Sequence, residues 1–290
     1  MVDRSAESLY RMNFGELDSM LSGFFTEKPG PGDMPEARVQ NESVDGLIVP
    51  DDSVWTSGYS IAWAYKRISE TAFKDVYVII GHSEGDDSKI LLGNIGTPFG
   101  VIRSDDVLAN SIHKMCGIRK SDIGSSKITE ETFLLHLPFL QFVSKDRLDR
   151  LKVLCISLGK DITLDQMKIL SDAIRVSASD LGRTMTNIAT SSLTHYGKSF
   201  DFVPFIYNVR ECIEDIDYRI IDMIKRKSYN EVYSYVSREN VSVYGFRTVV
   251  LLLMLMPENS LPKLLQYYNS SYIEKKDNDM ISHLSMEFSG

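Results

Sequence analysis

The chain has 290 residues, of which 43% are hydrophobic and 25% charged, and its formal net charge is −8. This composition is typical of a globular protein that buries a core, and it excludes a disordered chain. The acidic balance argues against a broad surface for nucleic acid or for an anionic membrane, because such surfaces need clustered lysine and arginine. The longest apolar run, 249–256, is far short of the roughly 20 residues of a membrane helix, and no apolar signal core is present. We therefore expect a cytoplasmic protein without a membrane span.

The first third of the chain alternates between helical and extended patterns. Residues 13–25 have apolar side chains at helical spacing, Asn13 is placed to cap the helix, and a Pro-Gly-Pro-Gly breaker follows. Residues 46–50 and 76–80 are short apolar runs that predict buried strands, and 58–69 between them has one apolar helical face.

The alternation continues to the C-terminal part. A third apolar run, 153–158, includes Cys155, and Thr163 and Gln166 have the spacing of a capping box that opens a helix. A short strand is predicted at 187–192, a long helix at 213–224 and a buried helix at 246–256. The three cysteines include no C-x-x-C pair, so neither a disulfide framework nor a zinc knuckle is indicated. We predict one domain over 1–290, an α/β/α sandwich with a central, largely buried mixed sheet.

Ligands of α/β folds gather at the carboxyl ends of strands, so four loops are the places to search for a site: 50–58, 81–87, 191–199 and 242–248. One of them, 81–85, reads Gly-His-Ser-Glu-Gly and matches the G-x-S-x-G motif of serine hydrolases at Ser83. That motif must turn directly into a helix, and the residues after Gly85 have no helical pattern. The Gly-Lys-Ser at 197–199 lacks the earlier glycine of a phosphate-binding loop, since that position is Ser192.

The five histidines include no pair at metal-binding helical spacing, so a metal site would need ligands from distant loops. We expect His113 and His283 at the surface, whereas the sequence alone assigns no role to His136. It also assigns no catalytic residue.

Read in order, these loops resemble the motifs of the Memo family, whose fold is shared with the LigB-like class III extradiol dioxygenases. The family's V-P-H-A-G-Y-x-Y-S-G matches 49–58 without a gap, and its S-S-D-x-[SC]-H-[YW]-G matches 190–197. Further matches are G-P-[NS]-H at 81–84, T-P-L-G at 97–100, E-H-S-x-E-x-[QH]-L-P-F-L at 130–140 and C-G-x-x-P at 244–248. The resemblance implies a LigB-like fold over most of the chain.

The departures from these motifs fall on the polar residues that line the family's site. Its histidines are replaced by Asp51, Glu84 and Glu131, and only His195 keeps its identity. Its glutamate, aspartate and cysteine are replaced by Leu134, Ser192 and Tyr244, respectively. The framework glycines and prolines are kept. The resemblance therefore implies a preserved backbone with altered chemistry.

An extradiol dioxygenase binds Fe(II) with two imidazoles and one carboxylate, whereas a carboxylate-rich cluster favours Mg²⁺, Ca²⁺ or Mn²⁺. One arrangement retains the iron set: if the 81–85 loop is extended, Asp51, His82 and His195 supply a carboxylate and two imidazoles. Whether the protein holds a divalent metal or no cofactor stays open.

The leading hypothesis is a Memo-family protein that has lost the usual metal site and acts as a non-redox binding or partner protein. Its ligand, a small molecule or another protein, would bind in a cleft around Asp51, His82, Glu84, Glu131, Ser192, His195 and Tyr244. The alternative is a metal-dependent oxidoreductase or hydrolase at the same place, or a serine hydrolase at Ser83. Exposed aromatics such as Tyr267, Tyr268 and Tyr272 are a further place for a partner to bind.

Overall fold

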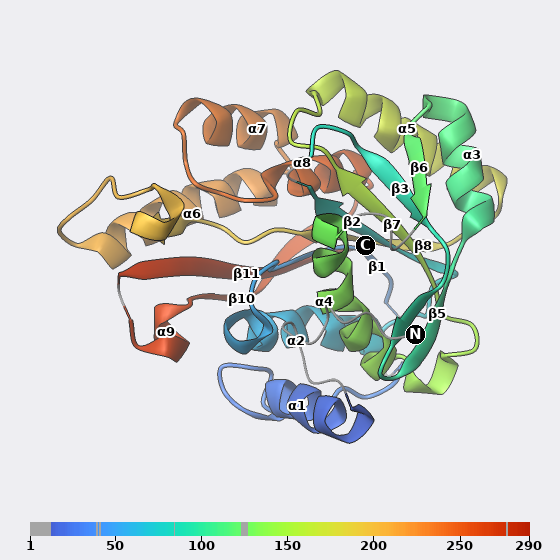
Figure 1. Ribbon diagram of the computed structural model, residues 1–290, viewed down its shortest axis with the longest axis horizontal. Coiled ribbons are helices and arrows are strands. Elements are labelled where there is room, and N and C mark those ends of the chain that lie inside the picture. The colour runs from blue at the N-terminus through green and yellow to red at the C-terminus, as the bar shows by residue number, and fades with distance from the viewer. Residues whose placement is uncertain (1–12, 39, 41, 84, 123–126, 277) are drawn as a thin grey trace.

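In the computed structural model of the protein, a mixed β-sheet runs through the middle and helices cover both of its faces (Figure 1). The structure describes residues 13–290 except 39, 41, 84, 123–126 and 277, and only the backbone of 127–131. This arrangement confirms the predicted α/β class with a central, largely buried mixed sheet.

The strands of the sheet follow the order β10-β11-β1-β8-β2-β7-β3-β6. The inner strands β1, β8, β2 and β7 are mutually parallel, whereas β11 runs antiparallel to β1 and to β10. The short β4 pairs with β5, and β9 pairs with β11. The bounds are β1 Val44–Val49, β2 Val76–His82, β3 Lys89–Leu92, β4 Ile95–Thr97, β5 Gly100–Ser104, β6 Arg119–Asp122, β7 Lys152–Leu158, β8 Met185–Thr190, β9 His195–Gly197, β10 Leu261–Asn269 and β11 Asp279–Ser289.

The helices form the two outer layers. Side chains of α3, α5, α6, α7 and α8 pack into the core on one face of the sheet, and those of α1, α2 and α4 into the core on the other. The bounds are α1 Phe14–Thr26, α2 Val54–Glu70, α3 Asp106–Cys116, α4 Lys127–Val143, α5 Leu164–Asp180, α6 Val209–Lys225, α7 Tyr229–Arg238, α8 Phe246–Leu255 and α9 Ser271–Glu274, with short 3₁₀ turns η2 at Lys145–Arg147 and η3 at Lys198–Phe200.

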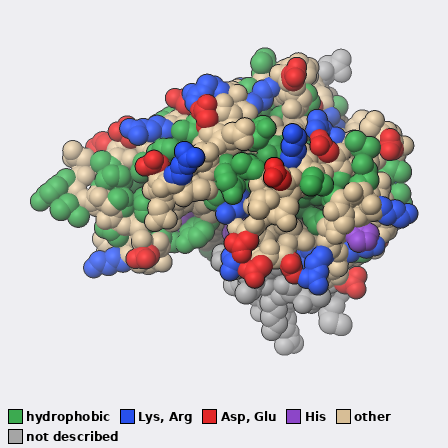
Figure 2. Space-filling model, turned by 90° about the horizontal axis from the view of Figure 1, so that it is seen from above, with side chains coloured by type: hydrophobic (Ala, Val, Ile, Leu, Met, Phe, Trp, Pro, Cys, Tyr) green, Lys and Arg blue, Asp and Glu red, His purple; other side chains and the backbone are tan. Residues whose placement is uncertain are grey.

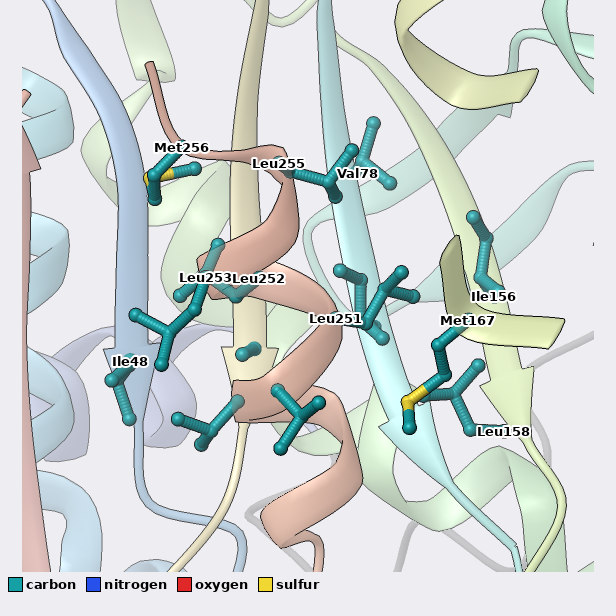
Figure 3. Close-up of a cluster of buried hydrophobic side chains, with 14 of the residues drawn as sticks. Ile48, Val78, Ile156, Leu158, Met167, Leu251, Leu252, Leu253, Leu255 and Met256 are labelled. Carbon is teal, nitrogen blue, oxygen red and sulfur yellow. The ribbon is translucent and has the colours of Figure 1, made fainter. Parts of the chain in front are cut away.

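The inner strands are apolar on both sides because each face contacts a core. In β2, Val78 and Ile80 point into the core under α8, whereas Tyr77 and Ile79 point into the core under α2 and α4. Figure 3 shows how closely α8 packs on the sheet, through side chains that meet those of β1, β2, β7 and α5: Leu251, Leu252, Leu253 and Leu255, facing Ile48, Val78, Ile156, Leu158 and Met167.

Local capping chemistry sets several element ends as predicted. The Asn13 side chain accepts a hydrogen bond from the Glu16 amide at the start of α1, and Thr163 and Gln166 form the capping box of α5. The helix predicted at 58–69 begins earlier, at Val54. The buried strands and the apolar helix α8 also appear where the sequence predicts them.

The C-terminal strand β11 was not predicted, and its place corrects one expectation. The prediction that His283 lies at the surface is wrong, since its side chain is fully buried. The reason is that β11 is an interior strand, paired with β10 on one side and with β1 on the other. Tyr268 on β10 is likewise buried rather than exposed, whereas Tyr272 is exposed as expected.

No described helix is long and apolar enough to cross a membrane. On the face drawn in Figure 2, acidic and basic side chains are interspersed among apolar ones. The excess negative charge is therefore not gathered into one area of that face.

Candidate functional site

The carboxyl ends of β1, β8 and β2 meet at one edge of the sheet. Val49 is the register partner of Thr190, and Ala189 is the partner of Ile80 on the other side. Because these strands are parallel and adjacent, the residues after β1 and at the ends of β8 and β2 come together. Asp51, His82 and Thr190 occupy those positions.

Asp51 is the centre of this edge. Its Oδ2 accepts hydrogen bonds from the hydroxyls of Thr132 at 3.0 Å and Thr190 at 3.3 Å, and Nδ1 of His82 lies 3.1 Å from it. The Asp51 amide donates to Oγ of Ser192 at 3.2 Å. We name Asp51, His82, Thr132 and Thr190 the Asp51 cluster.

The carboxylate of Asp51 stays ionised although its side chain is only 9% exposed. Burial alone would raise its pKa, but the nearby His82, with help from Thr132, holds the pKa below its usual range. Nδ1 of His82 faces this carboxylate outside the geometry of a normal hydrogen bond, so the contact acts mainly through charge.

Helix α4 covers the cluster from the side of α2. Thr132 and His136 are one turn apart on its buried face, so both reach the end of β1. His136 is fully buried, and no hydrogen bond of normal geometry reaches either ring nitrogen from the described residues. Burial lowers its pKa to about 4, against the opposing effects of Asp51 and the Pro50 backbone, so this imidazole is neutral at neutral pH.

His195 lies on β9 next to the same edge. Its Nδ1 donates to the Leu193 carbonyl at 2.9 Å, which leaves Nε2 as the acceptor of the neutral ring. Burial is the main cause that lowers its pKa to about 4, and the charges of both His82 and Asp51 act on it. The exposed ring of Tyr244 meets the imidazole edge to face, with 4.5 Å between the ring centroids.

Gly245 makes room for the cluster at the start of α8. It has a φ of +77°, and a Cβ there would lie 2.8 Å from the Thr190 carbonyl oxygen and 3.2 Å from Nδ1 of His82. Thr248, in the first turn of α8, donates to the same carbonyl at 2.9 Å. Only glycine combines this backbone conformation with so close an approach.

The pKa of a second acid, Asp52, is shifted in the opposite direction from that of its neighbour Asp51. Burial raises its pKa to about 6, and the charges of Asp51 and Glu274 act in the same direction. Oδ2 of Asp52 lies 3.9 Å from Nε2 of the buried His283. Burial lowers the pKa of His283 to about 3, so this ring too is neutral at neutral pH.

The comparisons with known proteins agree with the resemblance that these loops suggested. A family model described as "Memo-like protein" matches residues 3–287. The chain belongs to the Memo family. Its relatives include a "MEMO1 family protein" of Pyrococcus horikoshii, 28% identical over 93% of each chain, and one of Thermococcus kodakarensis, 29% identical over 72% of this chain and 71% of the relative.

A solved structure also shares the fold. An uncharacterised protein of Escherichia coli K12 matches with a TM-score of 0.52 and 10% identity, over 84% of this chain and 99% of the other. At this identity, the likeness concerns the fold alone.

The positions at which this chain departs from the Memo motifs do not all come together. Asp51, His82 and Ser192 meet directly, and His195 with Tyr244 lies beside them. Glu84 falls outside the described residues, and the side chain of Glu131 is not described. Leu134, where the family motif has glutamate, is buried in the apolar core under α2 and α4.

Among the described residues, Asp51, His82 and His195 are not gathered into one group with the spacing of metal ligands. No group of three or more His, Cys, Asp or Glu side chains among the described residues could hold a metal ion. Asp51 and His82 face each other, whereas the bond from Nδ1 of His195 to the Leu193 carbonyl leaves Nε2 as the nitrogen with the lone pair. Metal binding by Asp51, His82 and His195 stays a prediction that only a binding experiment tests.

Sequence reasoning missed several residues of this edge. It gave no role to Thr132, Thr190 or His136, and it overlooked Asp52 and His283. The four-residue spacing of Thr132 and His136 was a usable signal, since it places both on one helical face. Nothing in the sequence marked His283, because its burial depends on the pairing of β11.

Proposed function

We propose that this Memo-family protein works without the family's usual metal, as a cytoplasmic, non-redox binding or partner protein that uses the edge around the Asp51 cluster. The observation that carries the proposal is the environment of Asp51. Where the family motif has a histidine, this chain has a buried carboxylate whose Oδ2 already contacts two hydroxyls and an imidazole.

This environment supports a metal-independent role for a physical reason. A metal site needs lone pairs from several side chains that point at one shared position. Here Oδ2 of Asp51 already accepts hydrogen bonds from two threonine hydroxyls and faces Nδ1 of His82 at 3.1 Å, so neighbouring side chains take up its lone pairs. The side chains thus stabilise one another in place of a cation.

The same edge supplies groups that suit recognition. The Tyr244 ring is 43% exposed and lies against His195, and the His82 side chain is 29% exposed. A flat ring beside imidazole edges suits a small molecule or a partner side chain that has one planar face and a hydrogen-bond donor.

Metal analysis tests the proposal. The purified protein is dialysed anaerobically against Fe(II), Mn(II) or Zn(II), and the retained metal is measured beside that of His195→Ala. We expect wild type to retain no more metal than the variant, and neither to approach one ion per chain. One retained ion per chain that is lost in His195→Ala would overturn the proposal.

A metal-dependent enzyme at the same edge is the second candidate. It is favoured by one observation: Nδ1 of His195 donates to the Leu193 carbonyl, which leaves Nε2 with a lone pair near the contact between Asp51 and His82. Oxygen uptake with a catechol after anaerobic loading with Fe(II) tests the oxidoreductase, and a phosphate-ester and peptide panel with Mn(II) tests the hydrolase. Turnover that disappears in His195→Ala would favour this candidate.

A serine hydrolase at Ser83 has less support. The Oγ atom of Ser83 accepts a hydrogen bond from the Gly85 amide at 3.0 Å, and the loop leads into strand β3 rather than into a helix. The motif's strained corner between strand and helix is therefore missing. Ester hydrolysis by wild type that is lost in Ser83→Ala would reinstate it.

A further inference from the structure

A second site candidate lies at the opposite edge of the sheet from the Asp51 cluster. A cavity of about 220 Å³ is found there, lined by Phe73, Lys74, Asp75, Arg150, Lys152 and Arg183. These residues stand at the amino ends of β2, β7 and β8, so three adjacent strands contribute to it. In a chain of net charge −8, four of the six lining side chains are cationic.

The carboxylates near the cavity already have hydrogen-bond or ion-pair partners within the protein. Oδ2 of Asp75 accepts hydrogen bonds from the amide and the hydroxyl of Thr184, at 2.9 and 2.7 Å. Asp105 is nearly fully buried, accepts the Leu108 amide at the start of α3, and receives Nε of Arg183 at 3.1 Å. Its one charge faces two cations, because Nζ of Lys152 lies only 3.9 Å away.

Of the remaining cations, Lys74 donates to Oγ of Ser43 and Arg38 pairs with Asp146 at 3.0 Å, so Arg150 is the least compensated. The Arg150 side chain makes no hydrogen bond or ion pair with the described residues, although its charge reaches Asp75. Lys74 is partly buried, and burial lowers its pKa although Asp45 and Asp75 oppose the shift. The Arg38 guanidinium lies 5.2 Å from the centre of the Phe73 ring, and its Nε and Nη2 are buried without a hydrogen-bond partner among the described residues.

We propose that this cavity binds a dianionic phosphate group, either free phosphate or the phosphate of a small soluble monoester. Guanidinium and ammonium groups converging from three strands supply the donors that phosphate oxygens accept, and the Phe73 ring offers an apolar wall for a small organic part. This proposal is independent of the Asp51 cluster and of whether that cluster binds a metal.

Calorimetric titration with inorganic phosphate at constant ionic strength tests the proposal. We expect saturable binding of one phosphate per chain, weakened about tenfold or more in Arg150→Gln, since a charge-assisted contact of this kind is lost. Arg150 is the best position to change because its removal breaks no ion pair within the described protein. Arg226→Gln is the matched control, as Arg226 is exposed and pairs with Glu231 elsewhere.

A second titration, with glycerol 1-phosphate, distinguishes the two sources of the group. Tighter binding than that of inorganic phosphate indicates a monoester, and equal binding indicates free phosphate; both agree with the proposal if Arg150→Gln weakens them. Absence of saturable binding, or equal weakening by Arg150→Gln and Arg226→Gln, would overturn it. Unfolding midpoints of both variants show that the fold is intact.

Discussion

Nδ1 of His82 lies 3.1 Å from Oδ2 of Asp51, and the contact joins the ends of two strands that are not neighbours, because β8 lies between β1 and β2. Thr190, at the end of β8, completes the link with its own bond to the same oxygen. One carboxylate oxygen thus connects three strands and, through Thr132, helix α4.

Removing the Thr132 hydroxyl should weaken the cluster. Thr132→Val takes one donor from a buried carboxylate, so we expect the free energy of unfolding to fall by about 1–2 kcal/mol at pH 7. Thr132→Ser keeps the hydroxyl and should lose less than half as much. Urea unfolding measures both values, and a Thr132→Val variant as stable as wild type would contradict a stabilising bond between Thr132 and Asp51.

Gly245 should tolerate no side chain. Gly245→Ala must adopt a positive φ and also bring its Cβ close to the Thr190 carbonyl and to His82. Gly117→Ala is the control, since its φ is +71° but nothing lies within 4 Å of its Cβ position. We expect a loss of about 1 kcal/mol for Gly117→Ala from the backbone alone, and at least about 1 kcal/mol more for Gly245→Ala from crowding. Equal losses in thermal unfolding would remove the crowding argument.

His136 should make the protein sensitive to mild acid. Its pKa in the folded state is about 4, against 6.5 when unfolded, so between these values the unfolded chain binds the proton and stability falls as pH decreases. From pH 7 to pH 5, this one group should cost about 2 kcal/mol. His136→Phe keeps an aromatic ring on Tyr65 but cannot titrate. The variant should therefore lose about 2 kcal/mol less than wild type over that interval, and identical pH profiles would contradict the assignment.

Asp52 should have the opposite effect from His136: it should lower the stability of the protein as pH rises. Its folded-state pKa is raised from 3.8 to about 6, so the folded state holds the proton longer, and stability falls as pH rises through this range. Asp52→Asn keeps the oxygen that accepts from Thr56 but removes the charge. We expect the variant to be more stable than wild type by about 2 kcal/mol at pH 8 and equally stable at pH 4. A variant that is less stable than wild type at pH 8 would show that the charge is favourable.

The framework of this fold could be predicted because its signals are local. The apolar runs that became β1, β2 and β7 are continuous because both faces of those strands are covered, and the capping box of α5 needs only Thr163 and Gln166. The hairpin of β10 and β11 could not be predicted in the same way. Its Ser282, His283 and Ser285 look polar in sequence, and only pairing with β10 and β1 buries them.

The position of the candidate site could be predicted from the sequence, but the contacts between its side chains could not. Asp51 and His82 follow apolar runs, so their place at the carboxyl ends of strands was inferable from the pattern. That His82 turns its Nδ1 onto Asp51 depends on the strand order, which places β8 between them and Gly245 beneath them. The predicted cluster of three acids is not tested, since Glu84 and the Glu131 side chain are not described.

The measurement that tests the central claim most directly is the imidazole ¹H–¹⁵N spectrum of the protein with and without one equivalent of Mn(II), recorded anaerobically. If the Asp51 cluster is compensated by its own side chains, His82 shows a proton on Nδ1, and the His82 and His195 signals are unchanged by the paramagnetic ion. Selective broadening of both signals at one equivalent, absent in His195→Ala, would contradict the account and establish a metal site.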